Sequence, residues 1–184
     1  MSTGKSLTDG KITIRAFELQ DVPLMYAAAR ESIETVGPWL PWLHPDYSIR
    51  EAGEWAARCQ KTWAEETAYP FGIFESATGE VWGGLGIDHV NRVYNLAAVG
   101  YWVRASRTGH GIAPSAVRLA AKFAFSELGL TRVEIVVRLD NPASRRMAEK
   151  VGATFECIAR NRIFSRGLPF DAAVYSLVPG DVAV

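Results

Sequence analysis

The sequence predicts an α/β fold: a mixed, mostly antiparallel sheet of about seven strands flanked by about four helices. Two helical segments come early in the chain, and three strand-like segments joined by short turns follow them. Short turns connect antiparallel neighbours, so these three strands are expected to form a meander. The third strand is followed by a helix and another strand, and such a crossover places parallel strands in one sheet with a helix on its face.

The first half of the chain is expected to contain one strand and two helices. Residues 11–17 alternate apolar and polar side chains, as a half-buried strand does. Asp21 followed by Pro23 is typical of a helix start, and this helix is expected to run to about residue 35. Ser48 and Glu51 form a capping box that opens the second helix. The apolar residues of this second helix recur at helical spacing: Ala52, Trp55, Ala56, Cys59 and Trp63.

The second half of the chain is expected to contain the rest of the sheet and two helices. Its strands are expected at residues 69–75, 81–90, 96–103, 132–139, 153–159 and 172–178. Residues 114–128 form a helical pattern with one narrow polar stripe. Asn141 and Pro142 begin the last helix, and Gly152 ends it.

Composition and charge narrow the functional class. The 184 residues are 48% hydrophobic and 22% charged, which suits one domain over residues 11–184 behind a polar, flexible terminus at residues 1–10. The formal net charge is zero, so bulk electrostatics favour neither nucleic acid nor a membrane surface as a partner. No signal peptide or membrane span is evident, and a cytoplasmic location is expected. Two cysteines cannot form a disulfide framework or a zinc cluster, and no metal is expected.

The clearest chemical signal is a glycine-containing loop between the third meander strand and the next helix. It contains Arg-Thr-Gly-His-Gly-Ile-Ala at residues 107–113. Backbone N–H groups at a helix start carry partial positive charge, and glycine lets an anion approach the backbone closely. A pyrophosphate suits such a site, whereas a plain turn that needs glycine for its dihedral angles is the alternative. Pro114 replaces the third glycine of the dinucleotide fingerprint, and the Walker Gly-Lys-Ser/Thr ending is absent.

A second signal lies at the start of the last helix. Asn141 suits the N-cap position and Pro142 the first helical position, so capping explains both residues fully. Ser144 lies in the first turn of the same helix, and capping leaves its hydroxyl free for another role.

Four short motifs follow one another along the chain. They are Gly-Tyr-Trp-Val at 100–103, Thr-Gly-His-Gly-Ile-Ala at 108–113, Asn-Pro-Ala-Ser at 141–144 and Glu-Lys-Val-Gly-Ala at 149–153. Their order and spacing resemble the GNAT superfamily of acetyltransferases. With Trp-Leu-Pro-Trp at 39–42, they look most like its RimJ/RimL branch, the ribosomal-protein N-acetyltransferases and their relatives. The resemblance extends from Ile12 to Leu177 and indicates a superfamily, not a substrate.

The resemblance implies a binding site for acetyl-CoA. In the family this co-substrate lies in a V-shaped opening, where the third meander strand splays from the strand after the crossover. The pantetheine arm would pair with the backbone at Trp102 and Val103, and Asn141 would contact the CoA arm. Ser144 would lie near the thioester sulfur and help to protonate the leaving thiolate. The pyrophosphate would lie on backbone N–H groups from Thr108, Gly109, His110, Gly111, Ile112 and Ala113.

The general base is the least defined part of the expected site. Ala98 stands where many relatives carry an acidic or polar residue, and Ile163 lies in a stretch where relatives often have a glutamate. Two usual positions for a base are therefore empty. Asp88 and His89 end a meander strand near the expected acceptor cleft, and strand alternation turns only one of them toward it. Asp88 is the candidate base, and an ordinary solvated strand end is the alternative.

The proline-rich segment after the first helix is the candidate acceptor side. Trp39 and Trp42 would either plug the core or form a wall of the acceptor site. His44 follows them and would be an alternative base on the acceptor side.

The sequence thus predicts an N-acyltransferase that acts as a monomer or homodimer. A neutral amine would attack the thioester directly in a ternary complex, without a covalent enzyme intermediate. The shortage of a strong base favours a peptide N-terminal α-amine, whose pKa is about 7.7–8.0, over a lysine side chain with a pKa of about 10.4.

Three alternatives remain open. Arg160 or Arg162 would favour succinyl-CoA or another acyl-CoA as the donor. A polyamine or antibiotic acceptor would call for acidic residues along the cleft. A non-catalytic CoA-binding regulatory module would explain the missing acids at Ala98 and Ile163.

Overall fold

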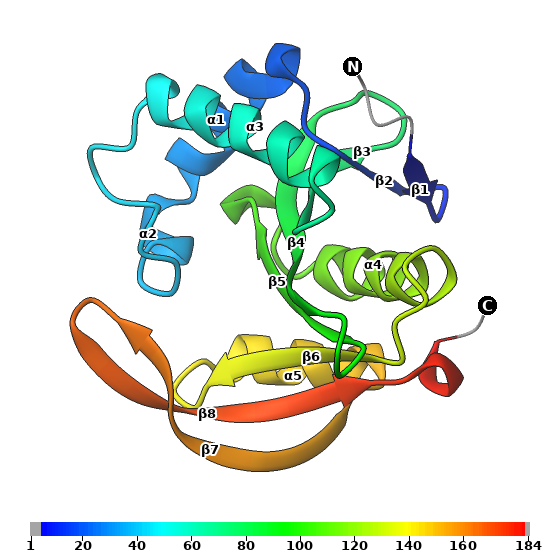
Figure 1. The fold of residues 1–184 in the computed structure, drawn as a ribbon. Coiled ribbons are helices and arrows are strands. Elements are labelled where there is room, and N and C mark those ends of the chain that lie inside the picture. Colours follow the sequence, from blue (N-terminus) through cyan, green and yellow to red (C-terminus); the bar gives the residue numbers. More distant parts are fainter. Residues whose placement is uncertain (1–4, 183–184) are drawn as a thin grey trace.

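A computed structural model describes residues 5–182 of the chain, and these residues form one mixed sheet with helices on both faces (Figure 1). The sheet has eight strands in the order β1-β2-β3-β4-β5-β6-β8-β7. The strands are β1 (Ser6–Thr8), β2 (Ile12–Arg15), β3 (Tyr69–Glu75), β4 (Val81–Asn91), β5 (Leu96–Val103), β6 (Arg132–Arg138), β7 (Thr154–Ser165) and β8 (Leu168–Leu177). The α-helices are α1 (Val22–Glu31), α2 (Ile33–Val36), α3 (Ile49–Ala64), α4 (Ile112–Ser126) and α5 (Pro142–Val151).

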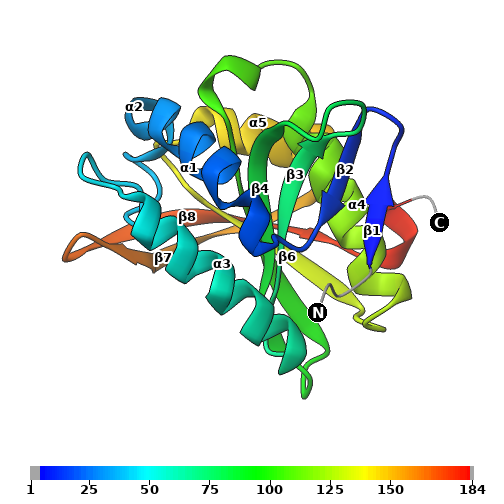
Figure 2. The same cartoon turned by 90° about the horizontal axis from the view of Figure 1, so that it is seen from above.

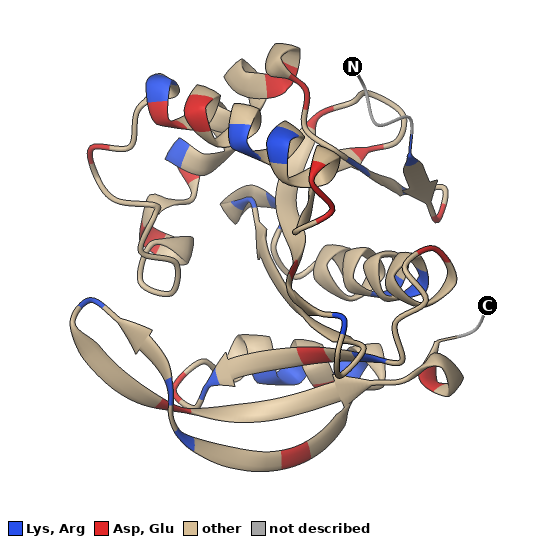
Figure 3. Ribbon diagram, in the orientation of Figure 1, with Lys and Arg blue, Asp and Glu red and all other residues tan. Residues whose placement is uncertain are grey.

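The helices cover the two faces of the sheet unequally. α1 and α3 lie side by side over one face, and α4 covers the opposite face (Figures 1 and 2). One buried core lies between α1, α3 and the sheet, around Phe17, Met25 and Trp102. The larger core packs α4 and α5 against the sheet, around Phe123 and Ile135. Lys, Arg, Asp and Glu residues are distributed over helices, strands and loops throughout the ribbon (Figure 3).

The sheet opens between its two parallel strands. β5 and β6 pair only through Leu96 with Arg132, Ala97 with Val133 and Ala98 with Glu134. Beyond these pairs β5 stays with β4 and β6 stays with β8, so the two strands diverge, as Figure 1 shows. The expected V-shaped opening is therefore confirmed. It leaves backbone groups of β5 and β6 without a strand partner along its inner edges.

The N-terminus contributes a strand where the sequence predicted a flexible segment over residues 1–10. Residues 1–4 lie outside the described residues, but Ser6–Thr8 forms β1 and pairs with β2. A tight turn explains the pairing, because the Asp9 carboxylate accepts hydrogen bonds from the backbone N–H groups of Lys11 and Ile12. Gly10 supplies the positive φ of +90° that this turn requires. The described residues thus form eight strands, one more than expected.

The first expected helix is interrupted, which raises the number of described α-helices from four to five. α1 ends at Glu31 and α2 begins at Ile33. The Ser32 hydroxyl between them donates a 2.7 Å hydrogen bond to the Ala28 carbonyl and accepts one from the Ala105 N–H. Bonding of a serine hydroxyl back to the preceding turn bends helices.

The last two strands are longer than predicted. β7 and β8 form one long hairpin that turns at Arg166 and Gly167, both with positive φ. Such a pair of φ values is typical of a type I′ hairpin turn. Nearly all of β7 is exposed, so the apolar alternation that marks a half-buried strand is missing from its outer part.

None of the described helices is long and apolar enough to cross a membrane. Nor does any group of three His, Cys, Asp or Glu residues in the same part of the chain gather as metal ligands would.

Candidate active site

A cavity of about 550 Å³ occupies the opening between β5 and β6. Its walls come from both diverging strands, from the loop before α4, from the first turns of α5 and from the segment that contains α2. Nine of the ten residues expected to bind the co-substrate line it: Trp102, Val103, Thr108, Gly109, Gly111, Ile112, Ala113, Asn141 and Ser144. Residues as far apart in the sequence as Trp102 and Ser144 thus line the same cavity.

The glycine loop has the geometry of an anion site. Gly109 and Gly111 have φ values of +79° and +76°, and a Cβ at either position would meet no atom within 4 Å. Gly111 is the N-cap of α4, so the N–H groups that follow it start a 15-residue helix at the cavity wall. His110 does not line the cavity. Its Nδ1 lies 2.8 Å from the Thr108 carbonyl, and its own carbonyl accepts a hydrogen bond from Lys11 Nζ.

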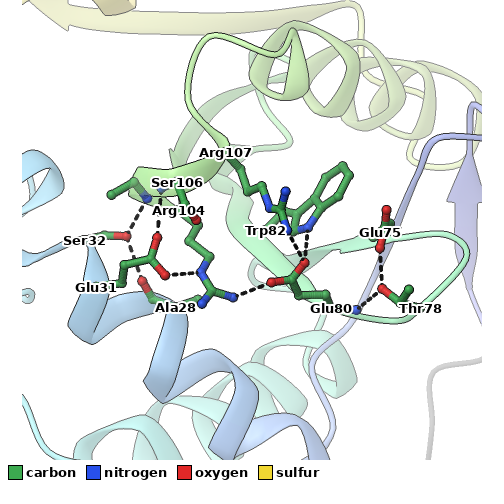
Figure 4. Close-up of polar contacts among 11 residues, drawn as sticks. Ala28, Glu31, Ser32, Glu75, Thr78, Glu80, Trp82, Arg104, Ser106 and Arg107 are labelled. Carbon is green, nitrogen blue, oxygen red and sulfur yellow. Dashed lines mark hydrogen bonds and ion pairs between the residues drawn. The ribbon is translucent and has the colours of Figure 1, made fainter.

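An ion-pair network holds the turn that leads into this loop (Figure 4). Arg104 Nε lies 2.6 Å from a carboxylate oxygen of Glu31 in α1, and Arg104 Nη1 lies 2.8 Å from Glu80 before β4. The other carboxylate oxygen of Glu31 accepts a 2.8 Å hydrogen bond from the Ser106 N–H. Arg107 completes the network, because its Nη2 lies 2.8 Å from the second oxygen of Glu80. The loop backbone is therefore fixed to α1 and β4.

The start of α5 presents the Ser144 hydroxyl to the larger cavity. The Asn141 side-chain oxygen accepts a 3.0 Å hydrogen bond from the Ser144 N–H, which confirms Asn141 as the helix cap. The Ser144 hydroxyl accepts a 3.0 Å hydrogen bond from the Tyr101 hydroxyl. Burial raises the pKa of Tyr101, so its phenol stays protonated at neutral pH. Tyr101 belongs to the Gly-Tyr-Trp-Val motif, but no sequence pattern links it to Ser144, which lies 43 positions away.

A second cavity of about 350 Å³ lies on the α1 and α3 side of the sheet. Two strand glycines, Gly84 and Gly86, form part of its floor, and their lack of side chains makes room for the Trp102 indole and the Asp88 carboxylate. Its other lining residues are largely apolar: Met25, Leu40, Trp42, Trp55, Arg58, Cys59, Thr62, Ala68, Pro70, Leu85, Asp88, Gly100, Tyr101 and Trp102.

Asp88 lies in this second cavity, and His89 does not. The carboxylate of Asp88 extends along the floor, because Oδ2 lies only 2.7 Å from where a Cβ on Gly86 would be. Burial raises the pKa of Asp88, and its carboxylate makes no hydrogen bond to any residue in the described range. His89 is exposed and has a φ of +54°, in a bulge between β4 and β5.

Ala98 is the cross-strand partner of Asp88. Directly paired residues in adjacent antiparallel strands point to the same face, so Ala98 lies on the same face of the sheet as Asp88, next to the cavity that Asp88 lines. The small Ala98 side chain leaves room for the Asp88 carboxylate. The acidic residue missing from β5 thus has a counterpart one strand away on β4.

The two cavities meet across β5. Leu40, Gly100, Tyr101 and Trp102 line both of them. Gly100 is exposed, and a Cβ at this position would meet no atom within 4 Å, so the strand is open there. A group held in one cavity can therefore approach a group held in the other through the gap between β5 and β6.

The tryptophans of the proline-rich segment form walls of the two cavities. Trp39 lines the larger cavity, with the Arg138 guanidinium 5.4 Å from its ring centroid. Trp42 lines the smaller one and packs edge-on against Trp102 at 5.8 Å. Both tryptophans thus line cavities, and neither is fully buried.

His44 lies outside both cavities, which corrects its expected place beside the acceptor. Its Nε2 lies 2.9 Å from the Glu51 carboxylate. Glu51 is the N3 residue of the α3 capping box, and hydrogen bonds from Ser48 and then from His44 lower its pKa to about 2. The imidazole is thus held against the start of α3 by a residue whose position the capping box fixes.

A comparison with known families decides the assignment. Residues 11–154 match the model of the acetyltransferase (GNAT) domain. The chain belongs to the GNAT acetyltransferase family. This match and the similarity to known N-acetyltransferases identify the protein as an N-acetyltransferase.

Several GNAT proteins are similar over nearly the whole chain. YdaF of Bacillus subtilis, named provisionally as a ribosomal N-acetyltransferase, is 27% identical over 172 residues that cover 91% of each chain. A Vibrio cholerae structure, named provisionally as a ribosomal-protein-serine acetyltransferase, has a TM-score of 0.86 and 28% identity, and covers 97% of this chain and 100% of its own. RimL, a ribosomal L7/L12 α-N-protein acetyltransferase in complex with coenzyme A, has a TM-score of 0.85 at 20% identity, covering 95% and 98%. The expected RimJ/RimL resemblance is therefore confirmed.

Proposed function

We propose that this protein transfers the acetyl group of acetyl-CoA to the N-terminal α-amine of a protein, by direct attack in a ternary complex. One observation carries the proposal. A cavity with an anion-binding loop and a cavity with a half-buried carboxylate meet at Gly100, where β5 separates from β6. Such an arrangement suits a reaction in which a phosphorylated donor and an amine approach from opposite faces of the sheet.

The residues of the larger cavity fit acetyl-CoA. Backbone N–H groups between Thr108 and Ala113 would hold the pyrophosphate, and the open space beside Gly109 and Gly111 lets phosphate oxygens come close. The unpaired inner edge of β5 at Trp102 and Val103 would pair with the amides of the pantetheine arm. Asn141 would contact the same arm. Bound there, the thioester supplies an activated acetyl group.

The protein groups around the gap suit direct aminolysis. Asp88 would accept a proton from the incoming ammonium, and the neutral nitrogen would form the C–N bond as the C–S bond breaks. Backbone N–H groups near Trp102 and Val103 would polarise the carbonyl oxygen as its charge develops. Ser144 would donate its hydrogen bond to the departing thiolate, which takes, by way of water, the second proton that the nitrogen releases as it becomes an amide.

The lining of the acceptor cavity favours a peptide over a polycation. Asp88 is its one acidic side chain among the described residues, and Arg58 adds a positive charge there. Repulsion from Arg58 would weaken the binding of a polyamine, whereas tryptophan and leucine walls suit a peptide backbone. The names of YdaF and RimL, both given as ribosomal acetyltransferases, point to a ribosomal protein as the acceptor.

The alternative donor, succinyl-CoA, would need a cation to pair with its extra carboxylate, and Arg160 and Arg162 were the residues considered for this role. Arg160 and Arg162 do not line the larger cavity, and Arg162 lies 3.8 Å from Glu134. Ile163 of the same strand does line it and adds an apolar contact. Arg138 does line the larger cavity, so acetyl-CoA is the proposed donor and succinyl-CoA is tested beside it.

The experiment is an acceptor screen with the purified full chain. Acetyl-CoA and succinyl-CoA are each incubated with peptides copied from ribosomal-protein N-termini, with N-blocked lysine peptides and with spermidine. Thiol release gives the rate, and mass spectrometry locates the acyl group. We expect acetylation of free N-termini. Faster acylation of blocked lysine peptides or of spermidine would refute the proposed acceptor, and faster reaction with succinyl-CoA would refute the donor.

A further inference from the structure

Tyr101 and Ser144 form a hydroxyl pair on the wall of the larger cavity. Tyr101 comes from the splayed half of β5, and Ser144 from the first turn of α5 on the other side of the opening. Their oxygens lie 3.0 Å apart, with the tyrosine as donor. The Ser144 hydroxyl donates to no residue that the structure describes, so its own proton is available to the cavity.

We infer that Tyr101 is a positioning residue that turns the Ser144 proton toward the leaving sulfur. This inference rests on the proposed function, because it assigns a means of orientation to the hydroxyl that faces the thioester. In this role Tyr101 acts through its hydrogen bond to Ser144.

The physical reason lies in the hydrogen-bonding capacity of serine. A serine hydroxyl has one proton and two lone pairs, and its proton rotates to the best acceptor within reach. In the first turn of a helix, the competing acceptors are nearby backbone carbonyls. A donor from Tyr101 fixes the Ser144 oxygen as an acceptor at a set position. Two hydrogen bonds in a row also polarise each other, which strengthens the bond from Ser144 to a developing thiolate.

Burial keeps Tyr101 in the role of donor. A phenolate would accept the Ser144 proton and withdraw it from the cavity. Because burial raises the pKa of Tyr101, the phenol remains protonated over the range in which an amine acceptor becomes neutral.

The test is a double-mutant cycle measured with acetyl-CoA and a free N-terminal peptide. We expect Ser144→Ala to lower kcat by about 10²-fold, at the low end for general-acid assistance. Tyr101→Phe is expected to lower kcat by about tenfold, which corresponds to about 1.4 kcal/mol of barrier, and to leave the KM for acetyl-CoA within about twofold. Once Ser144 is alanine, Tyr101→Phe is expected to change kcat by less than about twofold, because the two residues act as a unit.

Tyr47→Phe is the matched control. Its hydroxyl is buried without a partner among the described residues, and Tyr47 lines neither cavity. It should leave kcat unchanged in both backgrounds.

The possible outcomes distinguish a failure of the Tyr101–Ser144 inference from a failure of the proposed function. Non-additive losses in kcat support the positioning of Ser144 by Tyr101. Equal losses from Tyr101→Phe in both backgrounds would overturn it, because a packing role does not depend on Ser144. Wild-type kcat in Tyr101→Phe, with Ser144→Ala impaired, would also overturn it while leaving acetyl transfer intact. A wild-type protein that turns over none of the free N-terminal peptides would overturn both proposals.

Discussion

Asp88→Asn is the substitution that tests the acceptor site most directly. The Asp88 carboxylate makes no hydrogen bond within the described part of the chain, so an amide of nearly the same shape disrupts no described hydrogen bond. The change removes the negative charge and, with it, the ability to take a proton. Any loss of rate should then follow the protonation state of the acceptor amine.

The expected size of the loss depends on the pKa of the acceptor. At pH 7 roughly a tenth of α-amines, with a pKa near 7.7–8.0, are already neutral, against well under a thousandth of lysine side chains, with a pKa near 10.4. Without a base, kcat/KM for a free N-terminal peptide should therefore fall about tenfold at pH 7, whereas that for a lysine acceptor should fall about a thousandfold or more. At pH 9 most α-amines are neutral, and the defect toward the N-terminal peptide should largely disappear.

The assay follows thiol release from pH 6 to pH 9 for the wild type, Asp88→Asn and His89→Asn. His89 is exposed at the adjacent position and lines neither cavity, so its substitution should have little effect at any pH. A defect in Asp88→Asn that is as large at pH 9 as at pH 7 would refute proton acceptance and assign Asp88 to binding of the ammonium group. Wild-type kcat/KM at pH 7 would remove Asp88 from the site altogether.

Three further predictions concern binding and stability. Gly111→Glu should weaken acetyl-CoA binding, measured by calorimetry, at least about tenfold, or about 1.4 kcal/mol, because it places a negative charge at the glycine loop. Gly129→Glu controls for backbone strain, because Gly129 also has a positive φ but lines neither cavity, and this variant should bind acetyl-CoA normally. Because burial raises the folded-state pKa of Asp88, the folded state holds this proton more tightly, and stability should decline as pH rises from the unfolded pKa of about 3.9 through the folded value. Asp88→Asn should therefore melt at a higher temperature than the wild type at pH 7 and lose this advantage at pH 3; a lower melting temperature at pH 7 would contradict the assigned burial. Tyr47→Phe should leave the melting temperature unchanged or raise it, because it removes a buried hydroxyl with no described partner, and a clear drop would reveal a bond to water or to another group.

Short segments of sequence were enough to predict the parts of the site that depend on local backbone geometry. The turn with two glycines at Gly109 and Gly111, and the cap of α5 at Asn141, depend on the φ preference of glycine and on hydrogen bonds within one helical turn. These interactions involve residues a few positions apart, so they can be recognised before the fold is known. The resemblance to GNAT motifs then connected them into one expected donor site.

Tertiary structure decided the acceptor side and the relation between the two halves of the site. The divergence of β5 from β6, the pairing of Asp88 with Ala98 and the contact of Tyr101 with Ser144 depend on strand register and sheet twist over many residues. His44 was predicted beside the acceptor for the same reason: its position depends on a hydrogen bond to Glu51, a capping residue of α3, which sequence proximity to Trp42 does not reveal. The sequence therefore predicted the loop that is proposed to hold the phosphates of the donor, because local backbone geometry is enough to form that loop. Only the folded sheet determined which carboxylate faces the acceptor cavity, because a one-residue shift in strand pairing would turn Asp88 to the other face.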